Sequence, residues 1–166
     1  VKARGDEAVL EMTERFDGAK LAADQLAVSH AEFMAASLKA DPSLRQAVAE
    51  AEANIANFAK KSRRKDWQMR NSHGATVGEK FDPYQRVGIY IPGGTAPLVS
   101  TALMTITLAK VAGCPEIVVC TPCGKHGSIN PALMFAARAA GATEIYRVGG
   151  AQAIAALAYG TATSGV

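Results

Sequence analysis

The chain has 166 residues, of which 49% are hydrophobic and 20% charged, and its formal net charge is +3. This length and composition are typical of one globular domain with a real core, and so small a charge gives no indication of a nucleic-acid partner. No apolar run approaches the ~18–20 residues of a transmembrane helix, so no membrane span is predicted. The sequence opens at Val1 inside a predicted helix, without Met and without a basic, apolar leader, so we expect the native chain to start further upstream.

Three helices are predicted at the start of the chain, and each has a recognisable first turn. Asp6 is a candidate N-cap for the first, and Ser29 with Glu32 has the pattern of a capping box for the second. Asp41 followed by Pro42 is typical of the start of a third. The predicted helices cover residues 6–16, 29–39 and 41–64, and residues 1–66 are expected to form an N-terminal helical region.

The ends of two of these helices carry further polar residues. Asp17-Gly18 stops the first helix. The third ends in a group of cationic residues, which we interpret as a solvated helix end that complements the helix dipole. A site for phosphate or for an acidic partner is the alternative interpretation. The cationic residues are Lys60, Lys61, Arg63, Arg64 and Lys65.

Residues 67–85 are predicted to form a ribbon that connects the helical region to the rest of the chain. Its two strands are Trp67–Arg70 and Thr76–Phe81, with the turn at His73-Gly74. From Arg86 onward the pattern changes.

Strands then alternate with helices, and glycines stand at the helix ends. An Ala-Gly-x-x-Glu-Ile sequence occurs twice, at residues 112–117 and 140–145, as one helix-stop-strand unit used again. This alternation predicts an α/β fold with a parallel sheet and flanking helices over residues 86–166. The strands are expected at 86–91, 116–121 and 144–148, and the helices at 97–112, from Asn130-Pro131 to Gly141, and at 151–159.

The cysteine pattern indicates reduced thiols. Cys114, Cys120 and Cys123 are odd in number and no signal peptide precedes them, which favours a cytoplasmic protein. Cys120 and Cys123 have CxxC spacing, but no second pair follows. We interpret them as a strand cysteine and a loop cysteine, with metal or redox use as the alternative.

Two predicted strands end in a pair of glycines before a helix begins. These diglycine corners are Gly93-Gly94 and Gly149-Gly150. Such corners present backbone amides to anionic ligands, and ligands of parallel sheets bind where the strand order reverses. We therefore predict a ligand site at the corners, on the hypothesis that strand 86–91 is central, with one of the other two strands on each side.

Tyr90 and Gln152 stand beside the two corners. The Tyr90 ring can stack and its hydroxyl can bond at the strand end, while the Gln152 amide can both donate and accept. A core tyrosine with a satisfied hydroxyl and an ordinary helix-start glutamine remain the alternatives. No Gly-x-Gly-x-x-Gly fingerprint is present, so the pattern alone predicts an α/β domain with an anion-binding rim.

Four stretches carry a family resemblance: Arg86–Gly94 (RVGIYIPGG), Ala109–Gly113 (AKVAG), Val148–Thr161 (VGGAQAIAALAYGT) and residues 1–17. They are similar to histidinol dehydrogenase, and the resemblance covers essentially the whole chain. It implies an enzyme of histidine biosynthesis that oxidises L-histidinol to L-histidine through the aldehyde, with two NAD+ and a bound zinc. It also implies a homodimer with incomplete Rossmann-like domains that bind NAD in a non-standard way.

Position by position, the resemblance implies that Tyr90 and Gln152 contact NAD. Together with the corners, the predicted cofactor-binding residues are Tyr90, Gln152, Gly93, Gly94, Gly149 and Gly150. The family's third NAD contact, an asparagine in Gly-Pro-Gly-Asn, is expected downstream of Val166. The substrate-binding serine, the catalytic Glu-His pair and the zinc ligands are expected there too.

This sequence is therefore expected to be an N-terminal fragment that carries the NAD-contacting part. His30, His73 and His126 do not match catalytic positions, so we assign no catalytic and no metal-ligating residue and expect no dehydrogenase activity from the chain alone. Two alternatives stay open. One is a related dehydrogenase for another small polar alcohol, such as dihydroxypropanesulfonate. The other is a non-catalytic nucleotide-binding or assembly module.

Overall fold

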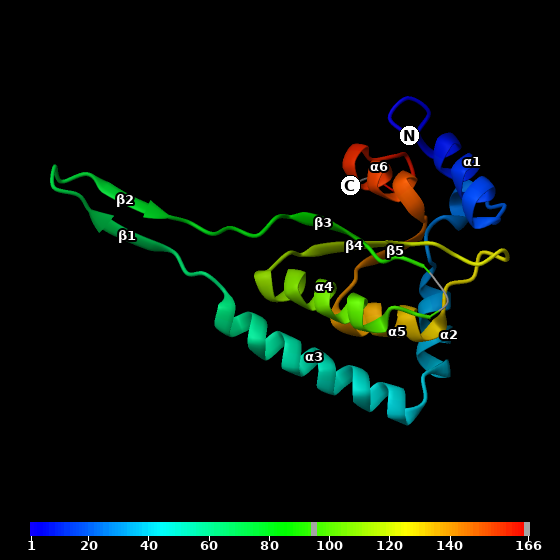
Figure 1. Cartoon of the computed structure of the whole chain (residues 1–166), viewed down its shortest axis with the longest axis horizontal. Helices are drawn as coiled ribbons and strands as arrows, with labels where there is room; N and C mark the ends of the chain where they lie inside the picture. Colours follow the sequence, from blue (N-terminus) through cyan, green and yellow to red (C-terminus); the bar gives the residue numbers. More distant parts are fainter. Residues whose placement is uncertain (94–95, 165–166) are drawn as a thin grey trace.

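The computed structural model describes residues 1–93 and 96–164. Strands and helices alternate in the part of the chain after the two-stranded ribbon (Figure 1). Each predicted helix and strand is present, with ends that differ from the prediction by two residues at most. The elements are α1 (Gly5–Asp17), η1 (Ala23–Gln25), α2 (His30–Lys39), α3 (Pro42–Ser62), β1 (Trp67–Arg70), β2 (Thr76–Glu79), β3 (Arg86–Tyr90), α4 (Val99–Ala112), β4 (Glu116–Thr121), α5 (Pro131–Ala140), β5 (Glu144–Arg147) and α6 (Gly150–Tyr159). Within the described part of the chain, none of the helices is long and apolar enough to cross a membrane.

The starts of α2 and α3 are capped as predicted. Ser29 Oγ accepts a hydrogen bond from the Glu32 amide at 3.3 Å, and the Ser29 amide donates to Glu32 Oε2 at 2.9 Å, which completes a capping box. Asp41 Oδ1 accepts from the Leu44 amide at 2.9 Å. These bonds satisfy backbone donors that no helical carbonyl can reach.

We expect Ser29→Ala to lower the free energy of unfolding by about 1 kcal/mol, because the mutation leaves a first-turn amide of α2 without its acceptor. Urea unfolding followed by circular dichroism measures the change. Ser43→Ala is the matched control, since Ser43 is exposed and its hydroxyl donates to the Asp41 carboxylate rather than capping an amide. Equal losses in the two variants would contradict the capping role.

Asp6 does not cap α1, so that prediction was wrong. The N-cap position of α1 is Arg4, which makes no side-chain cap bond. Asp6 Oδ2 instead accepts from the Thr163 amide at 3.0 Å and from the Thr163 hydroxyl at 2.8 Å. The carboxylate ties the start of α1 to the segment after α6, a partner from the far end of the chain that local sequence does not reveal.

The main sheet has three parallel strands in the order β3-β4-β5. The hypothesis that strand 86–91 is central is therefore wrong, because β4 lies in the middle. The segment Leu26–Val28 runs antiparallel along the outer edge of β5. The Val28 amide donates to the Ile145 carbonyl and the Arg147 amide to the Leu26 carbonyl, each at 2.8 Å.

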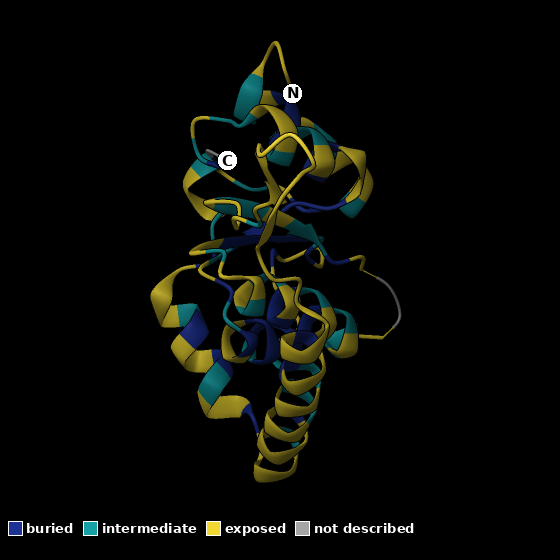
Figure 2. Cartoon of the chain, turned by 90° about the vertical axis from the view of Figure 1, so that its left-hand side faces the viewer, coloured by how far each residue is buried: buried dark blue, intermediate teal, exposed yellow. Residues whose placement is uncertain are grey.

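Helices cover both faces of this sheet, so its strands are apolar on both sides. Helices α4 and α5 lie on one face with α3 and α2 packed against them, and α1 and α6 lie on the other (Figure 1). Figure 2 shows buried residues gathered in the sheet and the helices next to it. Strand residues alternate between two cores, with Val87, Ile89, Ile117, Val119 and Ile145 on the α4–α5 side and Val118, Cys120, Tyr146 and Val148 on the α1–α6 side.

The ribbon of β1 and β2 extends away from this body (Figure 1). It is antiparallel, and all of its strand residues are exposed. Its register places the side chains of Trp67, Met69 and Val77 on one face. The ribbon therefore has an apolar face that no described residue covers.

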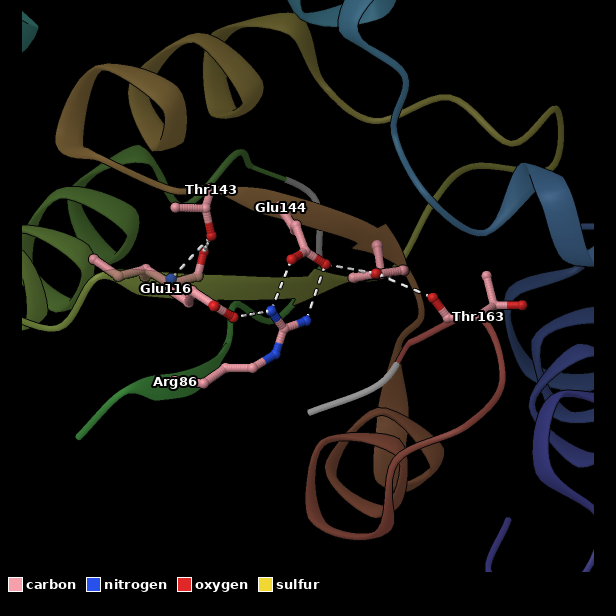
Figure 3. Close-up of polar contacts among 7 residues, drawn as sticks. Arg86, Glu116, Thr143, Glu144 and Thr163 are labelled. Carbon is pink, nitrogen blue, oxygen red and sulfur yellow. Dashed lines mark hydrogen bonds and ion pairs between the residues drawn. The ribbon is translucent and has the colours of Figure 1, made fainter.

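Arg86 links the three strands at the amino end of the sheet (Figure 3). Its Nη1 donates to Glu116 Oε2 at 2.5 Å and to Glu144 Oε1 at 2.8 Å, and its Nη2 donates to Glu144 Oε2 at 3.0 Å. The Tyr146 hydroxyl lies 2.6 Å from Glu144 Oε2 and 3.1 Å from the Thr163 carbonyl oxygen. One guanidinium thus joins β3, β4 and β5, and Tyr146 extends the network to the segment after α6.

Candidate functional site

A cavity of about 490 Å³ opens at the carboxyl ends of the strands. The chain leaves β3 there through Pro92-Gly93, and it leaves β4 through Pro122. Gly150 at the start of α6 and Asp17 at the end of α1 complete this wall. The segment that leads from β4 to α5 closes the other side, with Cys123, Gly124, Ser128, Ile129 and Asn130 among the lining residues.

Pro122 is the residue on which Gly93 and Gly149, one from each corner, pack. A Cβ on Gly93 would lie 2.3 Å from Pro122 Cγ, and a Cβ on Gly149 would lie 2.6 Å from Pro122 Cβ. Both distances are too short for any side chain, so these two positions have to be glycine for the backbone to come this close. The backbone therefore forms a tight rim over the end of the central strand.

The two corners follow the edge strands, not a central strand and its neighbour. The prediction that they flank a reversal of strand order beside a central strand is therefore wrong. They still share one cavity because adjacent strands are only ~4.8 Å apart, so three strands are narrow enough for both loops to reach Pro122. Gly94 lies outside the described residues.

Tyr90 connects the first corner to the second. Its hydroxyl accepts a hydrogen bond from the Gly150 amide at 3.2 Å, and its half-buried ring packs on the core on the α1–α6 side. Gly150 has φ of 60°, a left-handed conformation that favours glycine. The ring is thus partly a core residue, while the hydroxyl faces the rim as the sequence predicted.

Gln152 lies behind the rim. Its side chain is 3% exposed, and Oε1 would be 2.7 Å from a Cβ on Gly150. It is not among the residues that line the cavity, and its Nε2 has no hydrogen-bond partner among the described residues. The structure therefore brings Tyr90, Gly93 and Gly150 together around the cavity, with Gly149 against Pro122 and Gln152 one layer deeper.

The main charged group of the cavity wall is Asp17. Burial raises the pKa of its carboxyl, and hydrogen bonding from the Gly149 backbone acts in the opposite direction. Its Oδ2 is buried and has no hydrogen-bond partner among the described residues. The sequence does not distinguish Asp17 as a site residue, because Asp-Gly is also an ordinary helix stop. Only the packing of α1 on α6 brings it to Gly149.

The cysteines of the CxxC sequence are a strand and a loop residue, as predicted. Cys120 lies in β4 and Cys123 follows it, and they belong to different cores. Burial raises the pKa of the Cys120 thiol to about 12 and raises that of Cys123 as well, so both are protonated near neutral pH. Across residues 1–93 and 96–164, no three His, Cys, Asp or Glu side chains converge to hold a metal ion, so these residues do not fit zinc.

The fold and the cavity define an incomplete Rossmann-like α/β domain, with its open site at the carboxyl edge of a parallel sheet. The family model for histidinol dehydrogenase matches residues 1–165. The chain belongs to the histidinol dehydrogenase family.

Individual relatives agree with this assignment. The chain is 46% identical over 163 residues to histidinol dehydrogenase of Symbiobacterium thermophilum, which covers 98% of the chain and 37% of that protein. It is 48% identical over 163 residues to the Synechococcus sp. protein of the same name, which covers 98% of the chain and 38% of that protein. The crystal structure of histidinol dehydrogenase from Elizabethkingia anophelis matches with a TM-score of 0.89 at 38% identity, over 96% of this chain and 36% of that one. The chain thus spans little more than a third of the length of these relatives.

Proposed function

We propose that this chain is the cofactor-binding part of an NAD- and zinc-dependent histidinol dehydrogenase, which oxidises L-histidinol to L-histidine. The observation that carries the proposal is the convergence of Gly93 and Gly149 on Pro122, with the Tyr90 hydroxyl bonded to the Gly150 amide. Family membership supports the reaction. We extend the proposal to a homodimer in the cytoplasm, and the uncovered apolar face of the ribbon supports self-association.

The residues of the rim fit a dinucleotide. Gly93 and Gly149 let the ligand approach the backbone, and α6 directs its amino end toward the cavity through Gly150. The cavity volume of about 490 Å³ is within the ~300–1,000 Å³ of small-molecule sites. Bound NAD+ would supply the hydride acceptor. Tyr90 would orient it at the strand end, and Gln152 would support the first turn of α6 from behind.

The zinc-dependent part of the reaction is proposed for residues that the family carries beyond this sequence. The histidines at 30, 73 and 126 belong to separate segments, and none lines the cavity. We therefore propose that the purified chain binds NAD+ without oxidising histidinol. Histidinol-dependent formation of NADH by the chain would contradict this part of the proposal.

We expect Tyr90→Phe to weaken NAD+ binding by about fivefold. The mutation removes the Tyr90 hydroxyl, and the fivefold change corresponds to the loss of one hydrogen bond of that hydroxyl, about 1 kcal/mol. Isothermal titration calorimetry on the purified chain measures the affinity. Tyr159→Phe is the matched control, because that tyrosine is 59% exposed at the other end of α6. Absence of NAD+ binding by the wild-type chain would contradict the proposed function.

A further inference from the structure

The carboxylate of Asp17 lies in the cavity wall, where the Gly149 backbone hydrogen-bonds to it but no cationic side chain of the described residues pairs with it. It is the last residue of α1, where the negative end of the helix dipole opposes a negative side chain. None of the ion pairs within the described ranges includes Asp17, and its buried Oδ2 has no donor. A carboxylate oxygen that loses water without gaining a donor is unfavourable, so a donor that reached Oδ2 would stabilise this group.

The nearest side chains do not pair with Asp17. The stem of Lys125 lies beside the neighbouring Gly18, with Cγ 3.5 Å from the position of a Cβ there, but its ammonium forms no ion pair with Asp17. On the other side, Asp17 Oδ2 and Oδ1 would be 2.9 Å and 3.1 Å from a Cβ on Gly149. The carboxylate is thus held against Gly149, in a residue that lines the cavity, and its Oδ2 retains unused acceptor capacity.

These positions restrict the kind of ligand group that Asp17 can accept. A metal ion needs more ligands than this wall supplies, since no three candidate side chains converge in the described segments. A phosphate would bind the glycine corners and would be repelled by a carboxylate, so Asp17 has to bond a neutral donor next to the phosphate. Vicinal hydroxyls meet this need because two adjacent O–H groups can donate to the two oxygens of one carboxylate.

We propose that the Asp17 carboxylate accepts hydrogen bonds from the vicinal hydroxyls of one ribose of the dinucleotide at this cavity. The assignment rests on the proposed function, because it presupposes that NAD+ binds at the rim. It adds a residue that the diglycine corners, Tyr90 and Gln152 do not include. It also gives the unpaired Oδ2 of Asp17 a hydrogen-bond donor.

Calorimetric titration of the chain with NAD+ tests the assignment. Asp17→Asn keeps the shape of the side chain and removes its charge, and we expect it to weaken NAD+ binding about tenfold or more. Glu14→Gln is the matched control, because Glu14 is an exposed carboxylate on the same helix and should bind NAD+ like the wild type. The melting temperature of Asp17→Asn should stay close to that of the wild type, since Asn keeps an acceptor for the Gly149 backbone and removes a partly desolvated charge.

Two NAD+ analogues identify the group that Asp17 contacts, one lacking both hydroxyls of the adenosine ribose and one lacking both hydroxyls of the nicotinamide ribose. The analogue that lacks the contacted hydroxyls should bind the wild type more weakly than NAD+ does, by about the factor that Asp17→Asn costs in NAD+ binding. Wild type and Asp17→Asn should then bind that analogue with equal affinity. Equal NAD+ binding by wild type and Asp17→Asn would overturn the ribose assignment and leave the proposed function intact. The assignment would also be overturned if Asp17→Asn bound NAD+ and both analogues more weakly than the wild type by the same factor. Failure of the wild type to bind NAD+ would remove both proposals.

Discussion

Replacing Arg147 by methionine is expected to lower the free energy of unfolding by about 3–5 kcal/mol, because three main-chain carbonyls lose their donor at roughly 1–3 kcal/mol each. Arg147 is only 6% exposed. Its Nε donates to the Gly127 carbonyl at 2.6 Å, its Nη1 donates to the carbonyls of Gln25 and Ala27 at 2.8 Å each, and its Nη2 pairs with Glu32. The mutation would leave the three carbonyls without this donor, whereas the half-exposed Glu32 keeps its bonds from Ser29.

Chemical denaturation of the two proteins at neutral pH measures this loss. Arg4→Met is the matched control, because Arg4 also pairs with carboxylates, those of Glu7 and Glu11, but its side chain is 49% exposed. Exposed pairs contribute about 0–1 kcal/mol, so the control should unfold almost like the wild type. A loss of less than about 1 kcal/mol for Arg147→Met would show that the carbonyls find other donors and that this guanidinium does not hold the segments together.

Replacing Arg86 by methionine is expected to lower the free energy of unfolding by about 2–4 kcal/mol at pH 7, somewhat less than at Arg147 because the site is partly open. The Arg86 side chain is 21% exposed and pairs with Glu116 and Glu144 from the two neighbouring strands. Without it, two carboxylates remain close to each other at the amino end of the sheet. Far-ultraviolet circular dichroism in urea measures the change.

The same variant should change how stability depends on acid. The hydrogen bond from Arg86 is the largest cause that lowers the pKa of Glu144, burial opposes it, and Tyr146 adds a further lowering. Because the folded-state pKa is lower than the ordinary 4.5, this stabilisation is complete above about pH 4.5 and is lost as the pH falls through the folded-state value. Arg86→Met lacks the stabilisation that Arg86 gives to the Glu144 carboxylate. The difference in free energy of unfolding between variant and wild type should therefore become smaller as the pH falls below 4.5. An equal difference in free energy of unfolding at pH 7 and about pH 3 would contradict the coupling between Arg86 and the ionisation of Glu144.

Local signals in the sequence predicted most of the elements but not their partners. Ser29 and Asp41 cap the helices that follow them, and Gly113 and Gly141 end helices in the left-handed conformation, because each of these bonds closes within a few residues. Asp6 has the same local pattern, but Thr163 competes successfully for its carboxylate. Helix boundaries can therefore be predicted from the sequence, whereas the hydrogen-bond partner of a polar side chain depends on the tertiary fold.

The candidate site shows the same division. The diglycine corners and Tyr90 were predictable because strand, glycine and helix follow one another directly in the sequence. The central position of β4 was not, since all three strands are similarly apolar and their order depends on how helices pack between them. Pro122 and Asp17 gain their place in the site only from that order and from the packing of α1 on α6.

The short segment Leu26–Val28 has a consequence for how this sheet can grow. By pairing with β5 it occupies the amides and carbonyls that a further strand would need on that side. In the described part of the chain β3 carries a strand on one side only, which leaves its other backbone edge available. Any additional strand, whether from a longer form of this chain or from another molecule, therefore has to join beside β3, the strand that ends in Tyr90.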